Sequence, residues 1–142
     1  MTEIDRDRVA RAKADIHDAF GQMESLLGEG KERYLSDFKS RAALKYLLVE
    51  TVEAVADVCQ HLLARTKGLP CDGYIDCIVK VGKVGIISPE LSNRLRRLAD
   101  LRNSLIHRYW IIDDERLYEE TLQSKGDIRE FLDEIEVFLR AV

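Results

Sequence analysis

The sequence predicts an all-α fold, an up-and-down bundle of about five helices, from three observations. Apolar residues recur at three- and four-residue steps through several long stretches, the period of a helix that buries one face. Two prolines and eight glycines in 142 residues are too few for the many turns of a β fold. The breaks between the periodic stretches are short, as they are in helical bundles. A chain of this length is expected to form a single domain, here residues 1–142.

The first two predicted helices have long amphipathic faces. The first carries apolar residues from Val9 to Leu27 and ends at Gly28-Glu29-Gly30, where glycine favours a helix end. The second is the longest, beginning after Ser36-Asp37 and running to about Ala64. Its broad apolar face predicts burial against more than one neighbour. That face comprises Leu44, Leu47, Leu48, Val52, Val55, Val58, Cys59 and Leu62, widened by Val49 and Ala56.

A glycine and a proline in Lys67-Gly68-Leu69-Pro70 interrupt the chain after this helix. A short helix then starts near Ile75 and ends by Gly82 or Gly85. Its β-branched residues leave a strand as the alternative.

The fourth predicted helix begins at Ser88-Pro89-Glu90, because serine caps a helix, proline suits its first turn and glutamate favours its positive end. A last helical region begins after Asp113-Asp114 and is expected to break near Gly126. The residues of that region expected to face inward are Ile128, Phe131, Leu132, Ile135, Phe138 and Leu139.

The fourth helix has an arginine where its pattern calls for an apolar residue. Its apolar positions are Leu91, Leu95, Leu98, Ala99, Leu105 and Ile106. At about 100° per residue, Arg102 falls near the middle of the arc that these residues cover. A guanidinium keeps its charge and is costly to desolvate, so Arg102 needs a carboxylate, a bound anion or a water-filled cleft.

A narrow polar ridge on the second helix offers partners for this arginine. Glu50, Glu53, Asp57 and His61 recur there at near-helical spacing. Either the three carboxylates are the counter-charges of Arg102, or the ridge is a solvated stripe. A third interpretation is a metal site built from the carboxylates and the histidine, as occurs in helical bundles.

Composition and charge restrict the classes of function. A net charge of −4 argues against a protein that coats nucleic acid non-specifically, so no DNA partner is expected and any RNA must bind at a local basic site. Arginines outnumber acids between Ser88 and Tyr109. No apolar run approaches the roughly 20 residues of a membrane span, and the start at Met1 does not resemble a signal peptide. We therefore expect a cytoplasmic protein with no membrane partner.

The three cysteines, Cys59, Cys71 and Cys77, fit a reducing compartment. Their spacing matches neither a zinc-binding pattern nor a Cys-x-x-Cys redox pair. We expect all three to be small buried side chains.

The stretch Leu101-Arg102-Asn103-Ser104-Leu105-Ile106-His107-Arg108-Tyr109 resembles the signature of HEPN domains, and specifically of HepT-like toxins. The shared spacing is an arginine, four residues, a histidine, one residue and a tyrosine. The likeness extends from about Arg41 to Leu122 and includes the loop that carries Tyr74 and the segment 85–91. It implies a HEPN-like helical bundle.

This resemblance also implies a metal-independent ribonuclease toxin that acts as a homodimer on an RNA substrate, with neither a metal nor a cofactor. An RNA strand is cut when its 2′-hydroxyl attacks the adjoining phosphate. His107 suits the proton transfer in this reaction, because imidazole side chains titrate near neutral pH. Arg102 suits the phosphate, since its forked donors stabilise charge on the oxygens. Asn103 and Ser104 are expected to add minor polar contacts.

The spacing of the two principal residues conflicts with a site inside one helix. Arg102 and His107 are five residues apart and would point about 140° away from each other on a continuous helix. Either the helix is distorted near Ile106, or a second copy of the helix brings the other residue across a dimer axis.

Tyr109 has a separate implied role. In HepT-like proteins a nucleotidyltransferase antitoxin transfers AMP to the tyrosine of the His-x-Tyr element. AMP would add bulk and negative charge beside Arg102 and His107, and would compete with the substrate phosphate. The chain has no Gly-Ser pair followed by Asp-x-Asp, the signature of such an enzyme, so we expect the nucleotidyltransferase to be a separate partner.

Two other functions stay open. One is a non-catalytic HEPN helical dimer that serves as a docking or nucleotide-binding partner of a nucleotidyltransferase. The other is a metal-dependent hydrolase built into the bundle. The motif residues also have structural explanations, because a histidine at a helix end can be a surface residue and Tyr109 can pack in the core with its hydroxyl at the surface.

Overall fold

The computed structural model describes residues 3–108 and 112–142 of the chain, and within these ranges it contains helices and no strands. The all-α prediction is therefore confirmed. None of the described helices combines the length and apolar character that a membrane span needs. The elements are α1 (Arg6–Gly28), α2 (Lys31–Ser36), α3 (Phe38–Leu62), the π-helical turn η1 (Leu63–Lys67), α4 (Tyr74–Lys83), α5 (Pro89–Arg108) and α6 (Asp114–Ala141).

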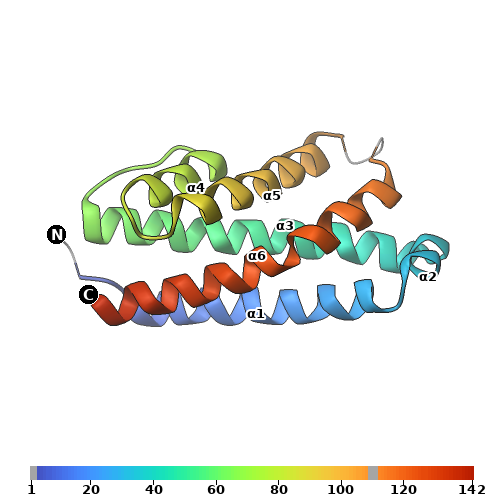
Figure 1. Cartoon of the computed structure of the whole chain (residues 1–142), viewed down its shortest axis with the longest axis horizontal. Coiled ribbons are helices and arrows are strands. Elements are labelled where there is room, and N and C mark those ends of the chain that lie inside the picture. The colour runs from blue at the N-terminus through green and yellow to red at the C-terminus, as the bar shows by residue number, and fades with distance from the viewer. Residues whose placement is uncertain (1–2, 109–111) are drawn as a thin grey trace.

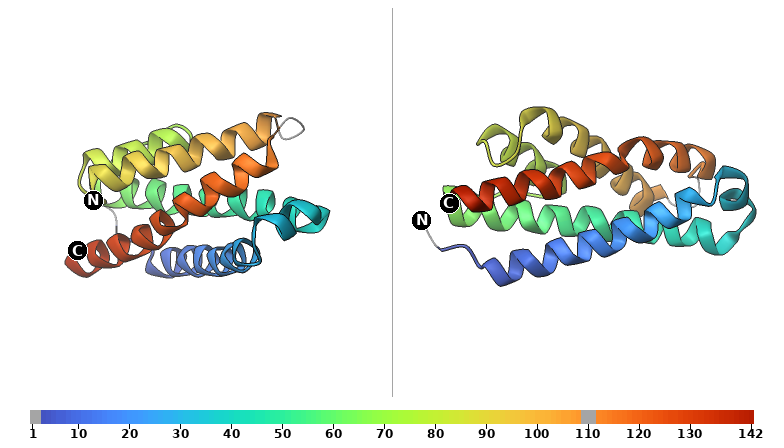
Figure 2. Two further views of the ribbon diagram at one scale, coloured as in Figure 1. Left: turned by 45° about the vertical axis from the view of Figure 1, so that its right-hand side comes forward. Right: turned by 60° about the horizontal axis from the view of Figure 1, so that its bottom comes forward.

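Helix α3 lies at the centre of the bundle (Figure 1). It packs against α1 on one side and against α4 and α5 on the other, while α6 runs back along the bundle and contacts both α1 and α5. The turned views show the same arrangement, with α4 and α5 paired beside one end of α3 (Figure 2). The prediction that this helix meets more than one neighbour is confirmed. The expectation that it is the longest is wrong, because α6 has 28 residues and α3 has 25.

Side-chain caps fix the starts of α5 and α6. At the start of α5, Ser88 Oγ accepts a hydrogen bond from the backbone N–H of Leu91 at 3.2 Å. The backbone N–H of Ser88 in turn donates to Glu134 Oε1 at 2.7 Å, which ties this end of α5 to α6. Asp113 caps α6 by accepting two backbone N–H groups of the first turn.

The structure corrects two details of the predicted helices. Helix α6 continues through Gly126, so the expected break there is wrong. One glycine inside a helix costs about 1 kcal/mol. The burial of Ile128 and Phe131 in the following turns stabilises the helix by more than this. The short helix α2 was not predicted, and it places the buried Tyr34 ring against Tyr118, with ring centroids 5.2 Å apart.

Helices α4 and α5 approach each other closely at Gly82. A Cβ atom at this position would collide with Cβ and Oγ of Ser92. The Ser92 hydroxyl also donates a hydrogen bond to the carbonyl oxygen of Ile78 at 2.8 Å. This contact sets the spacing of the two helices, and so the position of α4's first residue, Tyr74, beside α5.

The expectation of three small buried thiols is wrong for two of the cysteines. Cys71 and Cys77 form a disulfide, with their Cα atoms 5.0 Å apart. The chain turns from the loop after η1 into the first turn of α4, and this turn brings the two residues together. Cys59 is free and buried in α3, and burial raises the pKa of its thiol.

Candidate functional site

Arg102 projects from α5 between α3 and α4, and its side chain is only 13% exposed. Its Nη2 donates to Glu53 Oε1 of α3 at 3.0 Å and to the Tyr74 hydroxyl of α4 at 3.5 Å. Its Nη1 donates to Asn103 Oδ1 at 3.1 Å. The guanidinium carbon lies 4.3 Å from the centroid of the Tyr74 ring. Three helices therefore hold this cation in one position.

The position of Arg102 follows from the pattern of α5. Leu98, Ala99 and Leu105 surround it on the buried face of the helix. Its Nε is buried and has no hydrogen-bond partner among the described residues. An unpaired buried donor costs about 1–3 kcal/mol, which makes an arginine an expensive choice at this position.

Of the three carboxylates expected to balance Arg102, Glu53 is the one that contacts it. Asp57 pairs instead with Arg8 of α1, with Nη2 and Oδ1 2.7 Å apart. Glu50 lies instead near the exposed Tyr46, and its carboxylate raises the pKa of that phenol. The ridge therefore divides into three separate contacts along α3.

His61, the histidine of that ridge, is buried and belongs to the packing of the N-terminus. Its Nε2 accepts a hydrogen bond from the backbone N–H of Asp5 at 3.0 Å. Burial, followed by the charges of Arg8 and Arg65, lowers the pKa of its imidazole. The lone pair that a metal would need at Nε2 is thus already engaged, and the described residues contain no cluster of three metal-binding side chains.

His107 lies on the exposed side of α5, one residue before Arg108, the last residue of this helix that the structure describes. The helix is α-helical without interruption from Pro89 to Arg108, so the distortion considered near Ile106 is not present. Arg102 points into the bundle and His107 lies on the exposed face, as their spacing of five residues requires. One chain does not bring these two residues together.

The other motif residues are divided in the same way. Asn103 touches the Arg102 guanidinium, while Ser104 is exposed and its hydroxyl donates to the Asp100 carbonyl oxygen at 3.2 Å. Ile106 was expected to face inward and is 46% exposed, because α4 does not reach this end of α5 (Figure 1). Tyr109, the expected modification site, lies outside the described residues.

The structure has a groove between α5 and α6 that the sequence did not predict. It has a volume of about 640 Å³, and an adjoining hollow of about 240 Å³ extends it toward Arg108. Positive and negative side chains both line the groove, and they form ion pairs between Arg94 and Asp127 and between Arg116 and Glu120. Neither Arg102 nor His107 lines the groove. The contact between Tyr74 and Arg102 was missed as well, because residues 28 positions apart carry no spacing signal.

Solved structures with the same fold define the class of domain. The tri-AMPylated HEPN toxin of Shewanella oneidensis, in a complex with MNT antitoxin, superposes with a TM-score of 0.84 over 92% of this chain and 98% of that chain, at 20% identity. YutE of Bacillus subtilis, a cytosolic protein of unknown function, superposes with a TM-score of 0.75 over 99% and 94%, at 16% identity. The fold is that of a HEPN domain.

The sequence comparisons define the family within this class. A family model described as ribonuclease HepT-like matches residues 16–135, and the chain therefore belongs to the HepT-like ribonuclease family. The tRNA nuclease HepT of Aphanizomenon flos-aquae is 29% identical over 85 residues, which span 60% of this chain and 58% of that protein. A candidate RNase of Archaeoglobus fulgidus is 28% identical over 97 residues, spanning 68% and 73% of the two chains.

Proposed function

We propose that this protein is a metal-independent endoribonuclease toxin, with an active site formed by two copies of the chain. The observation that carries the proposal is the arrangement of α5, in which Arg102 points inward and His107 outward from one uninterrupted helix. A homodimer that pairs the α5 helices brings Arg102 of one subunit beside His107 of the other. Family membership and the named nuclease among the relatives support the reaction class.

The two residues fit the cleavage of RNA by its own 2′-hydroxyl. The 2′-oxygen bonds to phosphorus, the bond from phosphorus to the 5′-oxygen breaks, and the product carries a 2′,3′-cyclic phosphate. His107 accepts the 2′-hydroxyl proton, and a proton is returned to the leaving 5′-oxygen. Arg102 binds the phosphate oxygens, whose charge grows in the transition state. In this reaction the phosphate replaces Glu53 at the guanidinium, while Asn103 and Ser104 supply polar contacts.

We propose a separate nucleotidyltransferase antitoxin as the partner that controls the site. The toxin of Shewanella oneidensis carries AMP and is bound to MNT antitoxin, which supports the same arrangement for this chain. AMP on Tyr109 would place a phosphodiester close to His107 in the sequence, where its negative charge competes with the RNA phosphate. We propose a cytoplasmic location as well, because the RNA substrate of this reaction is found there.

One observation favours a second candidate function. The Arg102 charge is already balanced by Glu53 within the chain, and the guanidinium lines neither part of the groove. A HEPN dimer that only docks a nucleotidyltransferase would need no free guanidinium. This candidate predicts tight association with the partner and no cleavage of RNA.

Purified protein incubated with total tRNA and excess chelator distinguishes these functions. The proposal predicts cleavage by the wild type and its loss in both Arg102→Ala and His107→Ala. Arg33→Ala, on an exposed position of α2, and His17→Ala, on an exposed position of α1, are the matched controls and should cleave normally. Absence of wild-type cleavage, or cleavage that persists in both motif variants, would reject the nuclease.

A further inference from the structure

The Arg102 guanidinium lies over the face of the Tyr74 ring in a cation–π contact. The ring centroid lies 4.3 Å from the guanidinium carbon, and the phenol oxygen accepts from Nη2 at 3.5 Å. Tyr74 is the first residue of α4 and follows Gly73, whose φ of 86° turns the chain into the helix. The position of this ring therefore depends on the turn that precedes α4.

The ring and Glu53 hold Arg102 in different ways. Glu53 is 47% exposed and uses the N–H edge that a phosphate needs, so substrate and carboxylate compete for Nη2. An aromatic face attracts the guanidinium without using that edge. Tyr74 can therefore keep Arg102 oriented after a phosphate has displaced Glu53.

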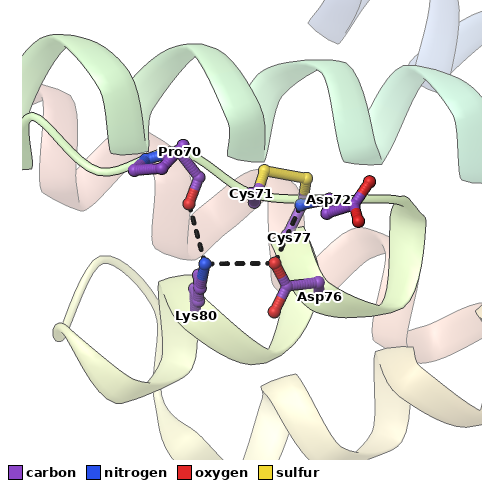
Figure 3. The surroundings of a disulfide bond; sticks show 6 residues. All are labelled: Pro70, Cys71, Asp72, Asp76, Cys77 and Lys80. Carbon is purple, nitrogen blue, oxygen red and sulfur yellow. Dashed lines mark hydrogen bonds and ion pairs between the residues drawn. A yellow bond between two sulfur atoms is a disulfide. The ribbon is translucent and has the colours of Figure 1, made fainter.

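The disulfide between Cys71 and Cys77 encloses the turn that carries Tyr74. It ties the loop before α4 to the first turn of that helix (Figure 3). Three polar contacts lie beside it (Figure 3). The Asp72 N–H donates to Asp76 Oδ2 at 2.8 Å, and Lys80 Nζ donates to the Pro70 carbonyl oxygen at 2.8 Å and pairs with Asp76 Oδ2 at 3.1 Å. All three are open to solvent and of modest strength, so the covalent bond is the main restraint on the turn.

We propose that Tyr74 is a positioning residue for Arg102, and that the Cys71–Cys77 disulfide holds it in place. The proposal rests on the proposed ribonuclease function. Reduction by a dithiol breaks the S–S bond, leaves two cysteine thiols and oxidises the reductant to its own disulfide. The freed turn lets the Tyr74 ring move from beneath the guanidinium. Cleavage is then faster in the oxidised protein than in the reduced one.

Two substitutions at Tyr74 separate positioning from packing. Tyr74→Phe keeps the aromatic face and should hold kcat within about twofold, because the 3.5 Å bond that it loses is weak. Tyr74→Leu keeps an apolar side chain without the face and should lower kcat about tenfold with little change in KM, since Arg102 is misplaced in the transition state. Wild-type kcat in Tyr74→Leu, or an equal loss in both variants, would overturn the positioning role.

The redox dependence is tested on the full-length wild type before and after treatment with dithiothreitol. Denatured oxidised protein should contain one titratable thiol, from Cys59, and reduced protein three. Reduction should lower kcat about three- to tenfold. The double variant Cys71→Ser, Cys77→Ser should show the reduced value with or without dithiothreitol.

Further results overturn the proposal. Three thiols in the protein as oxidised by air and oxidised glutathione would show that the disulfide does not form. Equal kcat at one and at three thiols would show that it does not restrain the site. No cleavage in either redox state would contradict the proposed ribonuclease function itself. Cleavage that requires Arg102, but that changes neither on substitution of Tyr74 nor on addition of dithiothreitol, would contradict only the role of Tyr74 and the disulfide.

Discussion

Glu53 Oε1 lies 3.0 Å from Arg102 Nη2, and this ion pair joins the middle of α3 to the buried face of α5. The arginine is nearly buried and the glutamate is half exposed, so solvent weakens the pair. The same pair neutralises the cation proposed to bind the RNA phosphate. Stability and substrate binding therefore make opposite demands on Glu53.

Glu53→Gln should destabilise the protein by about 1 kcal/mol, because Arg102 keeps a hydrogen-bond acceptor but loses its balancing charge. The same substitution should lower KM for RNA several-fold, since no carboxylate then competes with the phosphate. Chemical unfolding and steady-state cleavage measure the two effects. Glu50→Gln, on the same ridge but away from Arg102, is the control and should change neither; unchanged stability together with a raised KM for Glu53→Gln would contradict this account.

Stability should fall between pH 7 and pH 5 because of His61. Its pKa in the folded protein lies below the ordinary value of 6.5, so the unfolded chain binds more protons in this range. The stability that the neutral imidazole contributes is complete at pH values above its pKa in the unfolded chain. It is lost as the pH falls through its pKa in the folded protein. His61→Gln can still accept the Asp5 N–H and does not titrate, so its melting temperature should vary less with pH. Equal pH dependence in the two proteins would contradict the assignment.

Gly82→Ala should destabilise the protein by about 1–3 kcal/mol, because the new methyl group collides with Ser92 where α4 and α5 meet. The same displacement moves Tyr74 relative to Arg102, so kcat should fall as well. Gly126→Ala is the matched control: nothing lies within 4 Å of its added methyl group, and alanine in an unbroken helix should raise stability by about 0.5–1 kcal/mol. Thermal unfolding of both variants checks the expected opposite signs.

The helices and the unusual place of Arg102 could be predicted because both depend on local periodicity. A helical wheel is enough to put Arg102 among Leu98, Ala99 and Leu105, and the structure has it there. The same wheel separates Arg102 from His107, as the uninterrupted α5 does. These relations are set within one helix and need no knowledge of its neighbours.

Contacts between helices could not be predicted in the same way. Periodicity offered three carboxylates for Arg102, and Arg8 of α1 engages one of them, Asp57. Ile106 continues the apolar pattern, yet it lies beyond the part of α5 that α4 covers. Whether a patterned residue is buried depends on how far the neighbouring helix extends.

The disulfide and the continuity of α6 were missed for related reasons. The six-residue separation of Cys71 and Cys77 matches no common motif, and their meeting depends on the turn into α4. Gly126 is a local signal for a helix end, and the burial of residues after it outweighs that signal. In both cases contacts between distant parts of the chain determine the structure, and local sequence rules predict a different one.

The most direct measurement of the central claim mixes two inactive proteins, Arg102→Ala and His107→Ala, under conditions that allow subunits to exchange. Each mixed dimer retains one complete site, with Arg102 from one subunit and His107 from the other. Random exchange should then restore about a quarter of wild-type RNA cleavage, because half of the dimers are mixed and each has one of two sites. Cleavage that stays at the level of the separate variants, despite exchange confirmed by mass spectrometry, would contradict a site shared between subunits.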